Sequence, residues 1–483
     1  MSERGVTPQS EDFSQWYLDV VREAELADYA PVKGSMVIRP YGYAIWENIQ
    51  AALDQRFKVT GHKNAYFPLF IPLSFIQKES EHVEGFAPEL ALVTIGGGEE
   101  LEEPYVVRPT SETIINAMFA KWIQSYRDLP LLINQWCNVV RWEKRTKPFL
   151  RTLEFLWQEG HTAHATHQEA EEEAIRMLGV YQDFAEIVAA VPVVPGRKSD
   201  SEKFAGAVRS YTIEAMMRDK RALQAGTSHN LGDNFARAFE TQYLDENNEL
   251  QYVHQTSWGL STRFIGAIIM THGDDQGLRL PPRVAPIQVV FVPIWRTDEE
   301  RATVMAAVDR VAQSLPAGVR VEIDKREGLR PGFKFNDWEM RGVPVRIELG
   351  PRDVENEQVV IARRDVPGRD GKSSVLVSEV PARVTELLEE IQDNLFEQAK
   401  AFLRDNSFYP ETLEVFRQAV PETGGYGFAY AWWCGSQACE DRAKAELAGT
   451  TIRCVPFEQP EGAGKCLFCG EKAEEQVVFA KAY

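Results

Sequence analysis

Hydrophobic and polar positions divide the chain into three parts that follow different patterns. In the first part, apolar residues between 112 and 122 recur at helical spacing directly after Ser111, a residue type that often caps a helix. Short apolar runs typical of strands surround this helix. Three prolines in residues 281–286 then end the pattern, because proline fits neither a helix interior nor a central strand. We therefore place the first domain at residues 1–283.

The second part alternates between strand and helix. Residues 287–295 form an apolar run typical of a buried strand, and residues 298–315 carry the pattern of an amphipathic helix. A short helix is predicted around residues 335–340, and further strands are predicted at residues 319–324, 343–349 and 358–364. Such alternation is typical of βαβ units with a parallel or mixed sheet. We place this second domain at residues 284–400 and a third at residues 401–483.

The length and composition are those of a globular protein with more than one domain. A chain of 483 residues exceeds what one hydrophobic core usually supports, so two or three domains are expected. The net charge of −19 argues weakly against a nucleic-acid binder, although a local basic surface is compatible with it. The sequence has no run of 18 apolar residues and no secretory signal pattern, so we expect a cytoplasmic protein without membrane segments.

Five of the six cysteines lie in the last 50 residues of the sequence. Clustered cysteines in a large chain without secretory features favour a metal site over disulfides. Cys434 and Cys439 form one pair, and Cys466 and Cys469 form another, a spacing that suits a structural Zn²⁺ held by four thiolates. Reduced thiols without a metal are the alternative. Cys454 lies between the two pairs, and the spacing leaves its part in metal binding open.

Three histidines that follow one another at intervals of three suggest a different metal site. These are His161, His164 and His167, which would share one broad face of a helix. However, the preceding residues have a strand pattern, no HExxH sequence is present and no carboxylate completes a ligand set. We therefore favour ordinary polar histidines at the start of a helix, which suits His164 and His167 best.

The arginines of the same stretch suggest a phosphate site. If residues 139–143 form a strand, Arg141 and Glu143 share one of its faces. A second strand would follow the loop at residues 144–148. It would alternate Arg151, then Glu154 or Phe155, and then Trp157, Glu159 and His161 on one face. The planar fork of arginine suits phosphate oxygens, and a phenylalanine ring can stack on a purine. Two solvated strands with cross-strand ion pairs are the alternative.

Five segments, in order along nearly the whole chain, resemble motifs of one enzyme family. Residues 43–72 resemble motif 1 of class II aminoacyl-tRNA synthetases, residues 141–161 resemble motif 2 and residues 258–282 resemble motif 3. The segments RPTSET (108–113) and QAGTSHNLG (224–232) are similar to those of prolyl-tRNA synthetases. The combination resembles prolyl-tRNA synthetases of the archaeal/eukaryotic-like type.

This resemblance implies a fold, a reaction and a set of partners. The fold would be α/β (α+β), with a class II antiparallel-sheet catalytic domain, an α/β anticodon-binding domain and a small C-terminal zinc-containing α+β domain. The reaction would activate L-proline with ATP and Mg²⁺ as prolyl-adenylate, and then transfer the prolyl group to the 3′-terminal adenosine of tRNA(Pro). The enzyme would be a homodimer.

The resemblance also implies roles for individual residues. The reaction needs no protein nucleophile, so catalysis rests on positioning and charge stabilisation, and Arg141 and Arg263 would be the catalytic residues. The implied ATP-binding residues are Arg141, Glu143, Arg151, Thr152, Phe155, Gln224, Thr227 and Arg263. The implied proline-binding residues are Thr110, Glu112, Arg141, Trp157, Glu159, His161, Phe204, His229 and Ser261.

Anticodon contacts are implied in the second domain. The residues at the family's positions are Phe335, Glu339, Arg346 and Arg352, although the family often has lysine where this chain has Arg352. They offer a ring for stacking and charged groups for base edges, which is how single-stranded RNA is recognised. The C-terminal Tyr483 is expected to be buried near the active site with its carboxylate paired.

Three alternatives to this function differ in class. The first is a class II synthetase for another small amino acid, such as threonine or glycine. The second is an RNA-binding, zinc-containing protein that has lost catalysis, against which Arg141 and Arg263 argue. The third is a metal-dependent hydrolase built on the histidines.

Overall fold

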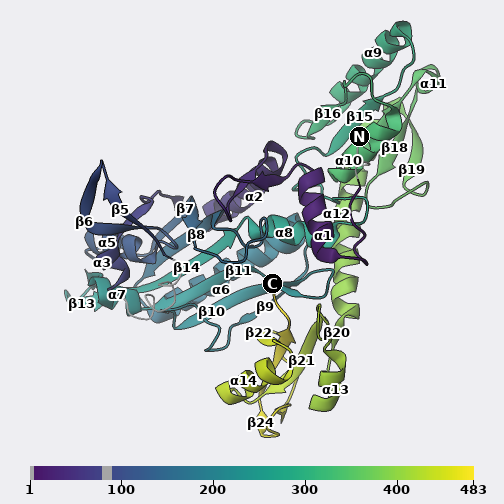
Figure 1. Ribbon diagram of the computed structural model, residues 1–483. Coiled ribbons are helices and arrows are strands. Elements are labelled where there is room, and N and C mark those ends of the chain that lie inside the picture. Colours follow the sequence, from purple (N-terminus) through teal and green to yellow (C-terminus); the bar gives the residue numbers. More distant parts are fainter. Residues whose placement is uncertain (1–4, 79–89) are drawn as a thin grey trace.

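A large, mostly antiparallel sheet forms the centre of the molecule. The computed structural model describes residues 5–78 and 90–483 (Figure 1). Within them, neighbouring strands of this eleven-stranded sheet run antiparallel except for the two outermost pairs. In spatial order its strands are β20 (Ser407–Phe408), β21 (Phe428–Trp433), β25 (Glu475–Ala480), β22 (Thr451–Pro456), β9 (Val193–Arg197), β10 (Arg209–Met216), β11 (Ala222–Gly232), β14 (His254–Ser261), β8 (Glu154–His164), β7 (Leu131–Val140) and β3 (Lys63–Asn64).

Helices cover one face of this sheet and form the main core with it. These helices are α2 (Pro40–Val59), α6 (His167–Asp183) and α8 (Arg263–His272). Trp258 of β14 lies at their centre, with its ring 5.0 Å from that of Phe57 and 6.2 Å from that of Tyr181. Side chains alternate along a strand, so the neighbours of Trp258 on β14 face the other side of the sheet, where a site can form.

The other elements of the first part surround the sheet. They are α1 (Phe13–Glu23), α3 (Leu73–Ile76), α5 (Glu112–Trp122), α7 (Asn234–Phe239), β1 (Ala27–Tyr29), β2 (Met36–Ile38), β4 (Phe70–Pro72), β5 (Ala91–Gly96), β6 (Glu99–Val107), β12 (Gln242–Leu244) and β13 (Leu250–Tyr252). Helix α5 confirms the helix predicted at residues 112–122. Ser111 is its N-cap residue, but its hydroxyl donates to Glu159 on β8 instead of capping the helix.

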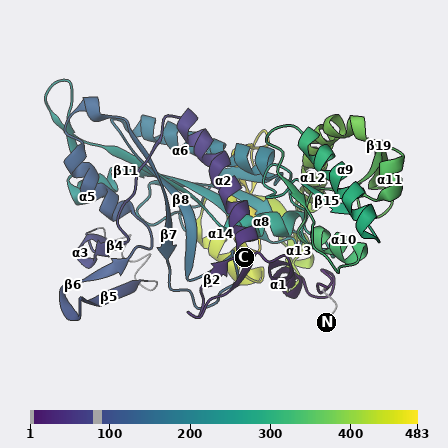
Figure 2. The ribbon, with the colours of Figure 1, turned by 90° about the horizontal axis from the view of Figure 1, so that it is seen from above.

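A second, mixed sheet lies at the opposite end of the molecule from β5 and β6 (Figure 2). Its spatial order is β16 (Val321–Ile323), β15 (Val289–Pro293), β17 (Val345–Leu349), β18 (Gln358–Arg363) and β19 (Lys372–Leu376). Strand β15 is parallel to both of its neighbours, and the remaining pairs are antiparallel. The accompanying helices are α9 (Asp298–Ser314), α10 (Pro331–Met340) and α11 (Pro351–Glu355). The alternation predicted from the sequence is confirmed.

The C-terminal part is joined to the large sheet. Helix α12 (Val380–Asp405) runs from the second sheet to this part, which also holds α13 (Leu413–Ala419), α14 (Gln437–Glu446), β23 (Gly464–Lys465) and β24 (Lys472–Ala473) (Figure 1). Strand β22 pairs with β9, so the C-terminal strands extend the large sheet. The sequence predicted a separate third domain and gave no sign of this pairing. In the part of the chain described here, no helix is long and apolar enough to span a bilayer.

The predicted strand at residues 139–143 is shorter than expected. Strand β7 ends at Val140 and β8 begins at Glu154, and the two strands are antiparallel, as predicted. The connection makes hydrogen bonds of its own, from Arg141 N to Leu153 O and from Lys147 N to Arg151 O. It also contains Pro148 and a residue of positive φ, Phe149, and neither continues a strand ladder. Arg141, Glu143, Arg151 and Thr152 therefore project from a loop.

Candidate active site

A cavity lies on the side of the large sheet away from the helical core. Most of the residues implied for ATP and proline line it, although they come from six separate segments of the chain. These residues are Thr110, Glu112, Arg141, Phe155, Trp157, Glu159, His161, Phe204, Gln224, Thr227, His229, Ser261 and Arg263. The remaining three, Glu143, Arg151 and Thr152, belong to the loop between β7 and β8. Arg151 Nε lies 3.6 Å from Glu143 Oε1, and Thr152 Oγ1 donates to Glu154 O at 2.7 Å.

Two arginines place positive charge in the cavity. Arg141 Nε donates to Pro109 O at 3.1 Å, and its guanidinium lies 5.6 Å above the Phe155 ring. Arg263 begins α8, and its Nε donates to Leu150 O at 3.0 Å. Burial, together with the charge of Arg141, lowers the pKa of Arg263 to about 10. A bound anion would relieve this repulsion, so the pair forms a receptor for phosphate or carboxylate.

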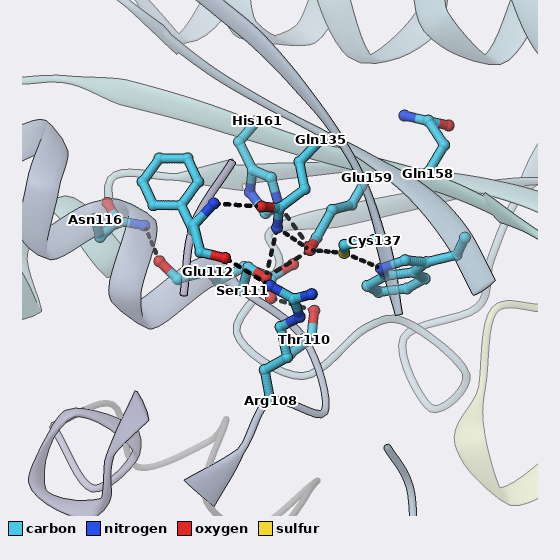
Figure 3. A network of polar contacts seen from close by, with 12 residues as sticks. Arg108, Thr110, Ser111, Glu112, Asn116, Gln135, Cys137, Gln158, Glu159 and His161 are labelled. Atoms are coloured by element: carbon cyan, nitrogen blue, oxygen red, sulfur yellow. Dashed lines mark hydrogen bonds and ion pairs between the residues drawn. The ribbon is translucent and has the colours of Figure 1, made fainter. Parts of the chain in front are cut away.

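A buried ion pair forms part of the cavity wall (Figure 3). His161 Nε2 lies 2.9 Å from Glu159 Oε2, and both side chains are almost fully enclosed. Burial alone raises the pKa of Glu159, but bonds from His161, Ser111 and Gln135 outweigh it and lower the pKa to about 2. Burial likewise lowers the pKa of His161, but its bond to Glu159 outweighs this effect and raises the pKa. Glu159 is therefore a carboxylate at neutral pH, and its contact with His161 favours the protonated form of that imidazole.

Glu112 is a second buried carboxylate beside this pair. It begins α5, and its Oε2 accepts a hydrogen bond from Thr110 Oγ1 at 2.5 Å. Glu112 is 3% exposed, so its charge is held in the cavity and not in solvent. A carboxylate next to flat rings such as Trp157 suits an ammonium group on a small apolar ring.

An aromatic pair closes the side of the cavity formed by β10 and β11. The rings of Phe204 and His229 are stacked with centroids 4.6 Å apart. Ser210 Oγ accepts the backbone N–H of Phe204 at 2.9 Å and lies 2.8 Å from His229 Nδ1. Burial, followed by the charges of Lys198 and Arg141, lowers the pKa of His229 to about 3. A neutral imidazole therefore faces the cavity.

The sequence missed several residues that shape this site. Ser111, Gln135 and Cys137 all place a polar hydrogen on Glu159 Oε1, at 2.5, 2.8 and 3.3 Å (Figure 3). Gln135 and Cys137 alternate along β7, so strand periodicity could have placed them on the site face. The cavity is also lined by Lys198, Glu202, Ser210 and Ser257. Of these, Ser257 could also have been placed on the site face by strand periodicity, because it lies two residues before the cavity-lining Gly259 on β14.

The three histidines do not form a metal site. His161 and His164 are an odd number of positions apart on β8 and point to opposite faces, and His167 is the first residue of α6. His164 Nε2 contacts Thr162 Oγ1, and burial lowers the pKa of His164 to about 4. The expectation of a helix start is confirmed for His167 and is wrong for His164. Among the described residues, the candidate metal-binding group contains cysteines only.

The four predicted cysteines meet in the C-terminal part. The thiols of Cys434, Cys439, Cys466 and Cys469 all lie within 4.8 Å of one another. Cys454 is fully buried on β22 and is not part of this group. Four soft thiolates in a tetrahedral arrangement are the donor set that Zn²⁺ prefers, so the residues present fit a structural zinc ion.

Three of the four predicted anticodon residues come together beside the second sheet. The guanidinium of Arg346 lies 4.3 Å above the Phe335 ring, and Arg346 Nη1 lies 2.7 Å from Glu339 Oε1. These three residues line a pocket that also includes Lys372. Arg352 is exposed on α11 and is not brought to this pocket, because β17 ends at Leu349 and a new helix turns the chain away.

Known families account for most of the chain, and the first of them defines its class. The family described as tRNA synthetase class II core domain (G, H, P, S and T) matches residues 93–272. The anticodon binding domain family matches residues 288–392. The large antiparallel sheet thus belongs to the core domain of a class II aminoacyl-tRNA synthetase.

The C-terminal part and the similar proteins specify the family further. The family described as prolyl-tRNA synthetase, C-terminal, matches residues 413–483. The chain is 60% identical to a chloroplastic/mitochondrial proline–tRNA ligase of Arabidopsis thaliana over 100% of this chain and 89% of that protein. It is 58% identical to a proline–tRNA ligase of Roseiflexus sp. over the whole of both chains, and 59% identical to one of Symbiobacterium thermophilum over 99% and 98%. The chain belongs to the proline–tRNA ligase family.

Proposed function

We propose that this protein attaches L-proline to tRNA(Pro) in two ATP-dependent steps. The observation that carries the proposal is a single cavity lined by two arginines, a buried carboxylate and flat rings. The arginines suit the phosphates of ATP. The carboxylate and the rings, which we call the amino-acid end of the cavity, suit the secondary ammonium of proline. Membership of the proline–tRNA ligase family supports the same substrates and does not favour threonine or glycine.

In the first step, the carboxylate of proline attacks the α-phosphorus of ATP. A bond forms between carboxylate oxygen and phosphorus, the bond to the bridging oxygen of the β-phosphate breaks, and pyrophosphate leaves with the electron pair. Arg141 stabilises the charge between carboxylate and α-phosphate, and Arg263 stabilises the phosphates from α8. Phe155, which lies under Arg141, stacks on the adenine.

Mg²⁺ is proposed to bind with ATP near β11. Gln224 and Thr227 line the cavity together with the two arginines and offer neutral oxygen ligands. Neutral oxygens suit an ion that keeps several waters and takes most of its remaining ligands from phosphates. When bound, the ion supplies charge neutralisation on the phosphate oxygens, and the residues orient the chain of phosphates.

Glu112 and His229 are proposed to orient the amino acid. Glu112, fixed by Thr110, accepts a hydrogen bond from the proline ammonium. The neutral ring of His229 and the stacked Phe204 form the wall against the pyrrolidine ring.

In the second step, the terminal adenosine hydroxyl of tRNA attacks the carbonyl carbon of the adenylate, and AMP leaves.

Exchange of pyrophosphate into ATP tests the first step. Wild-type protein with a panel of amino acids should exchange with proline and not with threonine or glycine. Arg141→Ala should lower the rate by a factor of about 10² or more, since one charge-stabilising donor is worth this much. Arg145→Ala, in the same loop but not among the cavity-lining residues, serves as control. Exchange with threonine but not proline contradicts the proposed substrate.

A structural Zn²⁺ in the four-cysteine group is also proposed. The protein should contain about one zinc ion per chain, because four thiolates leave no open position. Cys434→Ser with Cys466→Ser should remove the zinc while the three histidines remain. Cys454→Ser should keep it, since Cys454 lies outside the group. Zinc retained by the double variant in metal analysis would place the ion elsewhere.

The remaining proposals concern organisation. We propose domains at residues 1–283, 284–400 and 401–483, supported by family matches that stop at 272 and 392 and restart at 288 and 413. We also propose a cytoplasmic location and a homodimer. The dimer is supported by exposed apolar residues on either side of the edge strand β3, where Val59 is 84% and Tyr66 is 70% exposed. Light scattering that gives the mass of one 54.7 kDa chain would contradict the dimer.

A further inference from the structure

The segment from Lys198 to Ser210 forms one wall of the active-site cavity. Lys198, Glu202, Phe204 and Ser210 all line the cavity, although most of this segment is irregular loop. Its two ends are tied together, because Lys198 N donates to Ser210 O at 2.8 Å. Ser210 in turn holds Phe204 and contacts His229. The position of this wall therefore sets the shape of the amino-acid end of the cavity.

The C-terminal part contacts the start of this wall through four successive residues, 196–199. Gly196 pairs with Pro456 of β22, and a Cβ at this glycine would lie 2.4 Å from the Val455 carbonyl oxygen. Arg197 Nη2 makes two bonds to Glu475, at 2.9 and 3.0 Å.

The next two residues make the remaining contacts. Lys198 is bound to Glu214, which is bound to Arg453 of β22. Ser199 Oγ donates to Glu440 of α14 at 2.8 Å.

The contact through Glu214 is the most buried of the four. Glu214 lies on β10 and is fully enclosed, with Lys198 Nζ at 2.9 Å from Oε1 and Arg453 Nε at 3.1 Å from Oε2. Burial alone raises the pKa of Glu214, but Arg453 and Lys198 outweigh it and lower the pKa. Lys198 and Arg453 both bind the Glu214 carboxylate, so removal of one side chain changes the contacts of the other. The charge of Lys198 also acts on His229.

We propose that Arg453 is a positioning residue for the amino-acid end of the cavity. It touches no substrate. It acts through Glu214 and Lys198 to hold the segment 198–210 in place, so that the C-terminal part of the chain contributes to proline binding. This inference rests on the proposed function, because the ligand at this end of the cavity is taken to be proline.

Separate Michaelis constants for proline and ATP in the exchange assay, on the full-length protein, test the proposal. Arg453→Gln should raise KM for proline about fivefold and change KM for ATP by less than about twofold, the range expected for a residue that acts through packed neighbours. Arg453→Lys keeps the charge and should restore most of the loss. Arg417→Gln is the matched control, since Arg417 pairs with Glu414 and Glu446 of its own part of the chain.

A second measurement separates positioning from general destabilisation. In Arg453→Gln, backbone amides of residues 199–208 should exchange hydrogen faster, while those of α6 exchange as in the wild type. If Arg453→Gln does not fold, Ser199→Ala, which leaves the charged triad intact, should show the same pattern to a smaller extent.

Two results would overturn the proposal. One is an unchanged KM for proline in folded Arg453→Gln and Ser199→Ala. The other is an equal rise of both Michaelis constants, which indicates a general loss of structure. If the wild-type protein shows normal proline-dependent exchange, either of these results contradicts the role of Arg453 but not the proposed function. Absence of that exchange in the wild type contradicts the proposed function itself.

Discussion

At the scale of single residues, family motifs pointed to residues that line the cavity but not to the residues that hold them in place. Glu159 and His161 were assigned from the sequence, and the structure places them 2.9 Å apart in the cavity wall. Their charged state depends on Ser111 and Gln135, which lie 48 and 24 positions from Glu159 in the chain. Such partners cannot be found by local spacing, because only the folded sheet brings them together.

Glu159→Gln should impair both proline binding and stability. The buried His161 would lose its charged partner, so we expect KM for proline to rise about tenfold or more and the free energy of unfolding to fall by about 3 kcal/mol at pH 7. The wild-type pKa of Glu159 is about 2, against an ordinary 4.5. Its stabilisation is therefore present above pH 4.5 and is lost as the pH falls toward 2.

Urea unfolding at pH 3 and pH 7 tests the direction of this pH dependence of stability. The stability difference between wild type and Glu159→Gln should be smaller at pH 3 than at pH 7. Glu154→Gln is the control, because Glu154 lies on the same strand with its side chain exposed. A difference that grows at low pH would show that Glu159 is not held as a carboxylate.

At the scale of elements, the spacing of apolar residues predicted helices and strands well where a segment keeps the period of a single helix or strand. Helix α5 and strands β15, β16, β17 and β18 follow their predicted patterns, whereas β19 was not predicted. The prediction was wrong at residues 141–143, where the alternating pattern of a strand continues but the ladder stops at Val140. Pro148 and the positive φ of Phe149 decide this, and the resulting loop is what allows Arg141 to reach over Phe155.

The close contact between β8 and β14 predicts a sharp difference between two glycines. A Cβ at Gly160 would lie 2.0 Å from the Trp258 ring, which is fixed in the core, whereas a Cβ at Gly179 of α6 meets no atom within 4 Å. Gly160→Ala should lower the free energy of unfolding by about 3 kcal/mol through overpacking. Gly179→Ala should raise it by about 0.5–1 kcal/mol, since alanine suits a helix interior better. Chemical denaturation measures both, and a tolerated Gly160→Ala would mean that Trp258 can move.

At the scale of the whole molecule, the two sheets carry two separate pockets. The cavity of the large sheet and the pocket of Phe335, Glu339 and Arg346 share no residue. The C-terminal part, in contrast, is continuous with the large sheet through β22 and β9. A change in the second sheet should therefore affect tRNA selection alone, and a change in the C-terminal part should reach the active site.

Phe335→Ala tests this separation. Loss of the stacking ring should lower kcat/KM for tRNA charging about tenfold, since stacking on a base is worth about 1–3 kcal/mol. Proline-dependent exchange without tRNA should stay within about twofold of the wild type. Arg352→Ala should have a smaller effect on charging, because Arg352 lies outside the pocket. Equal losses in charging and exchange for Phe335→Ala would contradict the separation.

The sequence by itself determined the class of enzyme, the two arginines, the four cysteines and the alternating elements of the second sheet. The cysteines and the alternating elements depend on residue type and local spacing, whereas the class and the two arginines depend on motifs that resemble those of a known family. Only the tertiary structure decided that Cys454 lies outside the thiol group, that Arg352 lies away from its expected partners, and that Arg453 reaches Glu214 across 239 positions. Pairing between distant strands is set by the packing of the whole chain, and no local pattern records it.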